Sequence, residues 1–265
     1  MLKKRFFILT IIIVLCFSFS SEASVVSDFL KREPVKDQKT VVIMYHMISE
    51  NPKHINTYCI TPKELETDIN YLKENNYVFS CASEIEKMRK ENPDKNIAVL
   101  TFDDGYESDY KYVLPILEKY DAKATFFVFS GMLGEAYYMN EKQLKVLSDS
   151  PLTEIGNHSY EMHNKTLEEI RKFYSFNNLI YVEKDFLKNK KSLEKIIDAP
   201  VKSLSYPNGI YTILIDNMLK EKGICQVSFS TQEILYSSAS KVIGRYNRSD
   251  KRNVKEIIEK KINGN

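Results

Sequence analysis

Residues 97–105 read IAVLTFDDG, an apolar run that ends in two adjacent carboxylates with a glycine behind them. The run at 97–102 has no helical period and is rich in apolar and β-branched side chains, which predicts a buried strand. Asp103, Asp104 and Gly105 then end that strand. Since Asp-Asp-Gly after a strand is commonly no more than a solvated turn, the rest of the chain decides whether these carboxylates do chemistry.

Strands and helices alternate along the rest of the chain. Apolar, β-branched runs predict further strands over residues 40–48, 77–80, 124–130, 153–159, 202–207, 225–230 and 241–247. Periodic stretches predict helices over residues 61–75, 83–89, 108–120, 141–148, 166–190 with a break, 210–222, and after the last strand. The helix at 61–75 is sharply defined, because Thr61 can cap it, Pro62 suits its first position and Glu64 completes a capping box.

This alternation predicts parallel strands joined by crossover helices, and hence an α/β domain. Seven or eight such units at this length suit a barrel, complete or incomplete, with a doubly wound open sheet as the alternative. In both architectures the catalytic groups lie at the carboxyl ends of strands. Asp103, Asp104, His158, Tyr206 and the residues after Met44 all fall at such ends.

The first 23 residues have the layout of a secretory signal peptide. A basic start at residues 3–5 precedes an apolar run over residues 6–19, and the small residues that follow predict cleavage after Ala23. An uncleaved N-terminal anchor is the alternative. We therefore expect a secreted or extracytoplasmic protein. Residues 24–265 are expected to form one domain, because no linker, repeat or low-complexity tract divides them.

Composition excludes several classes of protein. The 38 basic and 36 acidic residues give a net charge of +2, which lends no support to nucleic-acid binding. Once the leader is removed, three cysteines remain: Cys59, Cys81 and Cys225. They are odd in number and widely spaced, so we expect small buried side chains and neither a disulfide framework nor a zinc knuckle. The lysine-rich stretch 184–195 is interleaved with Asp, Glu and Leu, which favours a solvated helix face. We expect a monomer.

Two of the four histidines, His158 and His163, lie close together in GNHSYEMHN. On a helix this spacing would rotate the second ring about 140° from the first, so a loop or irregular turn has to hold any shared ligand. Taken alone, the pair is most simply two unrelated histidines. Two histidines with one carboxylate, however, are the ligand set of an open catalytic zinc site, which lowers the pKa of bound water towards about 7. One aspartate of the pair would then bind metal while the other takes a proton from that water.

Three motifs together resemble the polysaccharide deacetylases of the NodB-homology type, carbohydrate esterase family 4. They are TFDDG at 101–105, HSYEMH at 158–163 and SYPNG at 205–209, and the resemblance covers about residues 40–247. It implies a deformed (β/α) barrel of about seven strands, and hydrolysis of the N-acetyl groups of an N-acetylglucosamine polymer. It also implies a general base, Asp103, and three ligands of a divalent metal, zinc with cobalt or nickel as alternatives: Asp104, His158 and His163.

Departures from the common pattern point to one subgroup of that family. The histidine gap is five residues rather than four, SYPNG has no Arg before it, and no histidine follows His163 to act as the general acid. MYHMI at 44–48 resembles the opening strand of a circularly permuted subgroup that includes the biofilm poly-N-acetylglucosamine deacetylases, whose acid His lies near the N-terminus. The resemblance therefore makes His46 the candidate acid, with a hydrogen-bonded core histidine as the alternative. His54, in a polar loop, is assigned no role.

The resemblance also implies that the backbone N–H of Tyr206 helps to hold the oxyanion of the tetrahedral intermediate. Arg245 and Arg248, in GRYNR, could orient Asp103 or bind the polymer, with a structural ion pair as the alternative. The chain is thus interpreted as a metal-dependent N-deacetylase of a cell-wall or extracellular polysaccharide, associated with membrane or wall if the N-terminal segment stays. A non-catalytic sugar-binding or scaffold protein and an O-acetyl carbohydrate esterase are the alternatives.

Overall fold

The computed structural model describes residues 39–51, 57–174, 178–237 and 239–262. They fall within one compact unit, Lys36–Asn265. The predicted signal peptide and His54 lie outside the described residues. Among the residues that are described, no helix combines the length and the apolar character needed to cross a bilayer.

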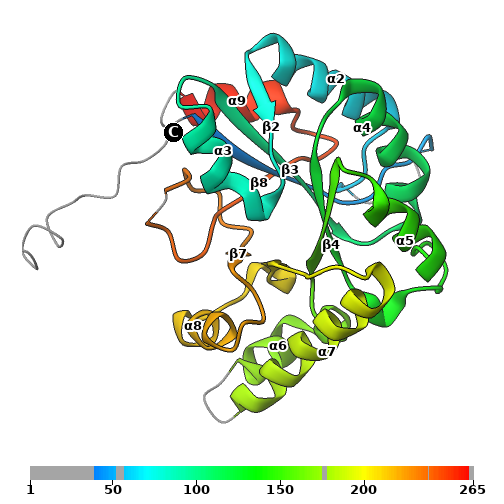
Figure 1. The fold of residues 1–265 in the computed structure, drawn as a ribbon, viewed down its shortest axis with the longest axis vertical. Helices are drawn as coiled ribbons and strands as arrows, with labels where there is room; N and C mark the ends of the chain where they lie inside the picture. The colour runs from blue at the N-terminus through cyan, green and yellow to red at the C-terminus, as the bar shows by residue number, and fades with distance from the viewer. Residues whose placement is uncertain (1–38, 52–56, 175–177, 238, 263–265) are drawn as a thin grey trace, which may run out of the picture. The chain divides into compact units, whose positions relative to one another are not determined.

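A parallel sheet forms the centre of this unit (Figure 1). Its strands are β1 Thr40–Tyr45, β2 Tyr77–Phe79, β3 Asn96–Asp104, β4 Ala124–Val128, β5 Thr153–Asn157, β6 Ser203–Ser205, β7 Val227–Phe229 and β8 Tyr246–Asn247. The main path runs β7-β6-β5-β4-β3-β1-β8, and β2 pairs with the first residues of β3. Every strand pairing is parallel, as the alternation of elements predicted.

The two ends of this strand order approach each other at Phe229. An isolated parallel bridge joins Phe229 to Ile243, and the Ser230 N–H donates to the Ile243 carbonyl over 2.9 Å. Because Ile243 leads into β8, which pairs with β1, the strands nearly complete a ring. The fold is therefore the deformed (β/α) barrel with seven strands on its main path, and the open doubly wound alternative was wrong.

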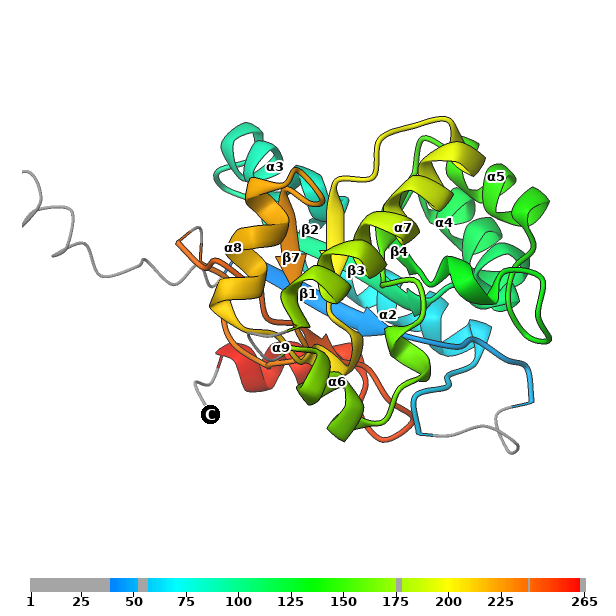
Figure 2. The same cartoon turned by 90° about the horizontal axis from the view of Figure 1, so that it is seen from below.

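The connecting helices cover the outer face of the sheet (Figures 1 and 2). They are α2 Pro62–Glu74, α3 Ile85–Glu91, α4 Leu114–Tyr120, α5 Glu141–Asp149, α6 Leu167–Phe173, α7 Leu179–Ile197, α8 Ile213–Glu221 and α9 Val254–Ile262. The predicted capping box is present at α2, where Thr61 accepts from the Glu64 backbone and the Glu64 carboxylate accepts from the Thr61 backbone. A π-helical turn, Asp109–Val113, precedes α4.

Alternation along β1 and β3 sorts their side chains between two cores. Ile43 and Leu100 lie in the larger hydrophobic cluster, together with residues of α2, α4, α5 and α9. Val42 and Val99, one position away on the same strands, lie in a smaller cluster with Phe127. Since successive side chains of a strand point to opposite faces, each strand contributes one face to the helices and one to the barrel interior.

The three cysteines among the described residues, Cys59, Cys81 and Cys225, are buried and unpaired, as expected. Burial raises the pKa of Cys59 to about 11 and that of Cys81 and Cys225 to about 12. Thiols held protonated in this way are poor nucleophiles and poor metal ligands, so all three fill space in the core.

Candidate functional site

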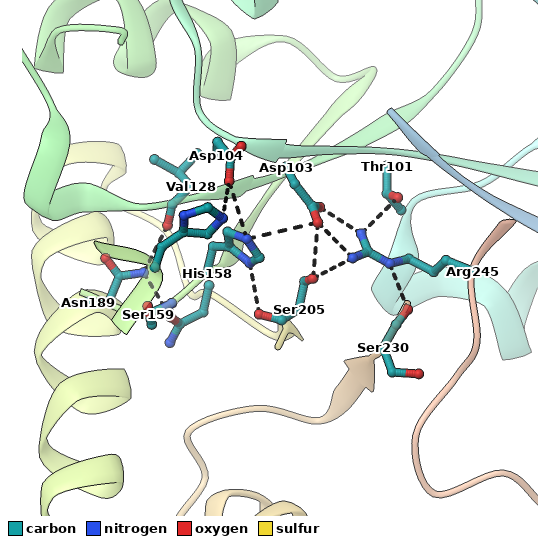
Figure 3. Close-up of polar contacts among 12 residues, drawn as sticks. Thr101, Asp103, Asp104, Val128, His158, Ser159, Asn189, Ser205, Ser230 and Arg245 are labelled. Atoms are coloured by element: carbon teal, nitrogen blue, oxygen red, sulfur yellow. Dashed lines mark hydrogen bonds and ion pairs between the residues drawn. The ribbon is translucent and has the colours of Figure 1, made fainter. Parts of the chain in front are cut away.

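The two aspartates at the end of β3 meet different surroundings (Figure 3). Asp103 follows the strand alternation and shares a face with Thr101. Asp104 has a φ of +81° and Gly105 a φ of +78°, so the chain turns sharply at once. A Cβ on Gly105 would lie 2.9 Å from a methyl carbon of Val128, and therefore both the turn and the approach of β4 require glycine. Regular alternation would send adjacent side chains to opposite faces of the sheet. Because the chain turns at Asp104, both carboxylates instead approach His158 Nε2, at 3.9 Å from Asp103 Oδ2 and 3.5 Å from Asp104 Oδ1.

Asp104 lies beside both histidines of the predicted pair. Its Oδ1 is 2.9 Å from His163 Nε2 and 3.5 Å from His158 Nε2, and one ligand atom from each of the three residues lies within 4.8 Å of the others. Apart from these imidazoles, the buried Oδ1 has no hydrogen-bond partner among the described residues. Burial raises the pKa of Asp104, but the two imidazoles outweigh burial and hold it well below its usual value. The three side chains therefore fit an open site for a divalent cation.

A hydrogen bond fixes the imidazole of His158 in the orientation that a metal ligand needs. Its Nδ1 lies 2.9 Å from the Ser205 carbonyl oxygen, so Nδ1 donates there and Nε2 is left to coordinate. Asn157, the residue directly before His158, holds the backbone around it. Its Oδ1 accepts from Asn189 Nδ2 over 2.8 Å and from the Ser159 N–H over 3.0 Å. Sequence reasoning missed Ser205, although its place at the carboxyl end of β6 could have indicated it.

The five-residue gap between the histidines is an irregular loop, as predicted. Ser159 has a φ of +72°, and His163 lies in a short 3₁₀ turn. Between them, the backbone N–H groups of Tyr160 and Glu161 donate to the Asp185 carboxylate of α7 over 2.9 and 3.0 Å. Asp185 therefore anchors the loop from a neighbouring helix. No sequence signal singled it out, because it is one acid in a lysine-rich stretch.

Arg245 holds Asp103 with both ends of its guanidinium. Its Nη1 and Nη2 donate to the two carboxylate oxygens over 2.6 and 2.7 Å, and further bonds reach Thr101, Ser205 and the Ser230 carbonyl. Burial raises the pKa of Asp103, but Arg245 brings it below the ordinary value. The side chain of Arg245 is 0% exposed, so it orients Asp103 and is not available to a polymer.

Arg248 forms the structural ion pair that was the alternative interpretation. Its Nε donates to Asp68 of α2 over 2.7 Å, and its own backbone N–H donates to the Met44 carbonyl over 2.9 Å. Both side chains are 3% exposed. Arg248 therefore ties α2 to β1 and has no contact with Asp103.

His46 directly follows β1, the strand next to β3. The register pairs Tyr45 with Phe102, so the residues that follow, His46 and Asp103, lie at the same edge of the sheet. Its Nδ1 is buried with no hydrogen-bond partner among the described residues, and its ring lies 5.1 Å from the ring of Tyr58. Burial lowers the pKa of His46, against the opposing effect of the two aspartates. His46 thus has one imidazole nitrogen, Nδ1, without a partner among the described residues, at the same edge of the sheet as the candidate base.

Tyr206 does not offer the free donor that the resemblance implied. Its backbone N–H donates to the Phe229 carbonyl over 3.0 Å, which continues the pairing of β6 with β7. Its phenol, 0% exposed, donates to Asp216 over 3.0 Å. In this geometry Tyr206 is a core residue, because strand pairing already uses the N–H group that was expected to face an oxyanion.

Comparison with known families identifies one family model that matches this chain. The family model for polysaccharide deacetylase matches residues 90–227. The chain belongs to the polysaccharide deacetylase family. The matched part of this polysaccharide deacetylase contains Asp103, Asp104 and both histidines of the pair, whereas His46 and Arg245 lie outside it. The structure therefore adds two side chains, one from each end of the chain, to the site that the family model spans.

Individual relatives extend the likeness beyond the matched segment. This chain is 27% identical over 189 residues to the putative polysaccharide deacetylase YxkH of Bacillus subtilis (strain 168). The matched residues make up 70% of this chain and 61% of YxkH. The chain is 25% identical over 253 residues to the poly-beta-1,6-N-acetyl-D-glucosamine N-deacetylase of Staphylococcus aureus (strain MSSA476), covering 87% of each.

Solved structures share the fold. IcaB from Ammonifex degensii matches with a TM-score of 0.73 at 22% identity, over 84% of this chain and 96% of that one. The Streptococcus pyogenes deacetylase PplD matches with a TM-score of 0.69 at 21% identity, over 86% and 98% of the respective chains. At these identities the likeness supports the barrel architecture of the polysaccharide deacetylase.

Proposed function

We propose that the protein is an exported, metal-dependent N-deacetylase that hydrolyses the acetamide groups of N-acetylglucosamine residues in a cell-wall or extracellular polysaccharide. One observation carries the proposal: two adjacent carboxylates have different partners. Asp104 lies against the imidazole nitrogens of His158 and His163, and Asp103 pairs with the guanidinium of Arg245. The named substrate of the Staphylococcus aureus relative supports the choice of polymer. The layout of the first 23 residues supports export, and nothing in the proposed chemistry requires more than a monomer.

The proposed cation ligands are Asp104, His158 and His163. Nitrogen and carboxylate donors of this kind suit zinc first, and cobalt or nickel as well. A cation bound there lowers the pKa of water and polarises the acetamide carbonyl. Ser205 and Asn157 keep the His158 ring and its loop in place for that purpose.

Asp103 is the proposed general base. Water adds to the acetamide carbon and gives its proton to Asp103, which Arg245 keeps ionised and fixed in orientation. His46 is the proposed general acid: it protonates the sugar nitrogen as the C–N bond breaks, so that acetate and a free amine leave. Its place beside Asp103 across the β1–β3 pair, with an imidazole nitrogen that has no partner, supports this role.

Acetate release tests the proposal directly. Purified protein supplied with zinc or cobalt should release acetate from β-1,6-linked N-acetylglucosamine oligomers or from peptidoglycan, and the Asp103→Asn variant should not. If no such polymer yields acetate above the variant's level, the proposal is wrong. Faster release from O-acetylated than from N-acetylated sugars would point to an esterase. Binding without turnover, unaffected by Asp103→Asn or His46→Ala, would point to a scaffold protein.

A further inference from the structure

A pocket of about 170 Å³ adjoins the loop that carries both histidines. The loop forms one wall, and α6 and α7, which pack side by side in Figure 2, form the others. Three lysines line it, Lys165, Lys184 and Lys188, and we therefore call it the lysine pocket. Three aromatic residues line it as well: Tyr160, Phe173 and Tyr181. None of these residues has a role in the proposed hydrolysis.

The lysine pocket carries positive charge that no ion pair neutralises. Among the described residues, none of Lys165, Lys184 and Lys188 lies within ion-pair distance of a carboxylate in the structure's salt bridges. Two acids also line the pocket, Glu161 and Asp185, and the Asp185 carboxylate accepts hydrogen bonds from the backbone of the loop. The lining therefore holds three ammonium groups against two carboxylates, an excess of one positive charge. The pocket therefore offers ammonium groups to an anionic ligand.

Aromatic rings line the same pocket. Lys188 Nζ lies 3.4 Å from the centre of the Tyr160 ring, and Lys165 Nζ lies 5.9 Å from that of Phe173, so each ammonium group is held against an aromatic face. Tyr181 is 61% exposed at the edge of the pocket. An apolar ring face beside polar groups suits a sugar, which presents C–H bonds on one face and polar substituents at its rim.

The position of the lysine pocket ties it to the proposed reaction. Tyr160 is two residues after His158, and Lys165 is two residues after His163. Two residues of extended chain span at most about 7 Å, so the pocket walls begin immediately beside the proposed metal ligands. A ligand in the pocket would therefore contact the loop that carries both proposed histidine ligands.

We propose that the lysine pocket is a subsite for a carboxylate-bearing sugar residue adjacent to the N-acetylglucosamine that is deacetylated. The inference rests on the proposed function and narrows the substrate to those N-acetylglucosamine polysaccharides that also carry carboxylate groups. Exposed ion pairs are each worth up to a factor of about five, so a single carboxylate shared by these lysines predicts a preference of about three- to tenfold. Because the charges are exposed, added salt should weaken that preference.

A matched pair of substrates tests the subsite. One is a β-1,6-linked N-acetylglucosamine pentamer that carries a succinyl ester on a ring hydroxyl, and the other carries a butyryl ester, with the same number of carbons and no charge. For the zinc-loaded enzyme, kcat/KM for acetate release should favour the succinyl compound about three- to tenfold at low salt. The preference should be smaller at 0.5 M salt, where the Debye length is about half of its value of about 8 Å in physiological buffer. Equal values at low salt would overturn the subsite.

Two double variants locate the effect. Lys184→Gln with Lys188→Gln should bring the ratio of the two kcat/KM values close to one. Lys142→Gln with Lys195→Gln removes the same charge from a separate pocket, between α5 and α7, and should keep the ratio. Loss of the ratio in the second variant alone, or its survival in the first, would overturn the assignment.

Failure of the subsite and failure of the proposed function give different results. If neither the unsubstituted pentamer nor peptidoglycan releases acetate above the level of the Asp103→Asn variant, the proposed function is wrong, and calorimetric binding of the two esters still tests the subsite. Tighter binding of the succinyl compound that disappears in the Lys184/Lys188 variant supports the lysine pocket. Equal binding of both compounds overturns it.

Discussion

Arg245 and Arg248 are three residues apart, both are buried and both pair with an aspartate, yet their partners differ in character. Arg245 donates two short bonds to Asp103 and lowers the pKa of that carboxyl despite burial. Arg248 donates one short bond to Asp68, where burial wins and the pKa is raised. A buried ion pair alone therefore does not mark a functional site.

The two ion pairs differ in what else lies near the carboxylate, apart from the arginine. Asp103 Oδ2 lies 3.9 Å from His158 Nε2, at the end of a strand where the proposed cation site begins. Asp68 is surrounded instead by the Tyr45 hydroxyl and the Val254 N–H, at 3.4 and 3.3 Å. One pair faces the proposed reaction site and the other is enclosed by the fold, so the same substitutions in the two pairs should have different effects.

The largest expected difference comes from the carboxylates themselves. Asp103→Asn should lower kcat by about 10²–10⁴-fold, because a general base is lost, while Asp68→Asn should leave kcat near the parent value and lower stability. Steady-state acetate release and urea denaturation measure the two effects. A comparable fall of kcat in both variants would remove the distinction between the pairs.

Removing either arginine should cost stability, but only one should change the chemistry. Arg245→Met and Arg248→Met each leave a buried carboxylate without its partner, a loss of about 3–5 kcal/mol. Arg245→Met also removes the cause that lowers the pKa of Asp103, so the acid limb of the kcat/KM profile should move to higher pH. Identical pH profiles for the parent and Arg245→Met, measured on the folded fraction, would contradict the role of Arg245.

His46 should set the opposite limb of the pH profile. Burial lowers its pKa from 6.5, and only the imidazolium can protonate the leaving nitrogen, so kcat/KM should fall as pH rises through a value below 6.5. His46→Gln should abolish that limb and lower kcat by about 10²-fold, the lower end of general-acid contributions. A profile that keeps the limb in His46→Gln would assign it to another group.

The smallest expected effects come from one hydroxyl in each ion pair. The Ser205 hydroxyl donates to Asp103 over 3.4 Å, and the Tyr45 hydroxyl donates to Asp68 over 3.4 Å. Ser205→Ala should reduce kcat/KM about fivefold, which corresponds to about 1 kcal/mol of transition-state binding, the net value of one hydrogen bond. Tyr45→Phe should lower the free energy of unfolding by the same amount, about 1 kcal/mol. Kinetics and denaturation of both variants check this. An effect of Tyr45→Phe on kcat/KM as large as that of Ser205→Ala would go against the comparison.

Much of the fold could be predicted from the sequence, because its signals are local. The capping box at α2 and the alternation of strands with helices depend on neighbouring residues, and both were confirmed. The last strand was wrong in length: residues 241–247 were predicted, but β8 covers only Tyr246–Asn247. The Arg245 N–H donates to the Gln232 carbonyl, a loop partner that no local pattern reveals.

The same distinction, between local sequence signals and long-range contacts, decides which parts of the candidate site could be predicted. Asp103, Asp104 and His158 could be placed together, because parallel strands bring their carboxyl ends to one edge. Whether the Tyr206 N–H is free depends on the register of β6 with β7, which the sequence does not specify. The separate partners of Arg245 and Arg248 likewise depend on how the chain crosses the barrel end.

The zinc affinity of two variants tests most directly the claim that adjacent carboxylates have separate tasks. Titration against a chromophoric chelator should show Asp103→Asn binding zinc as tightly as the parent protein. Asp104→Asn should bind at least about 100-fold more weakly, since losing even an outer partner of a ligand costs about 10–100-fold. Equal loss of affinity in both variants, or unchanged affinity in Asp104→Asn, would contradict the claim.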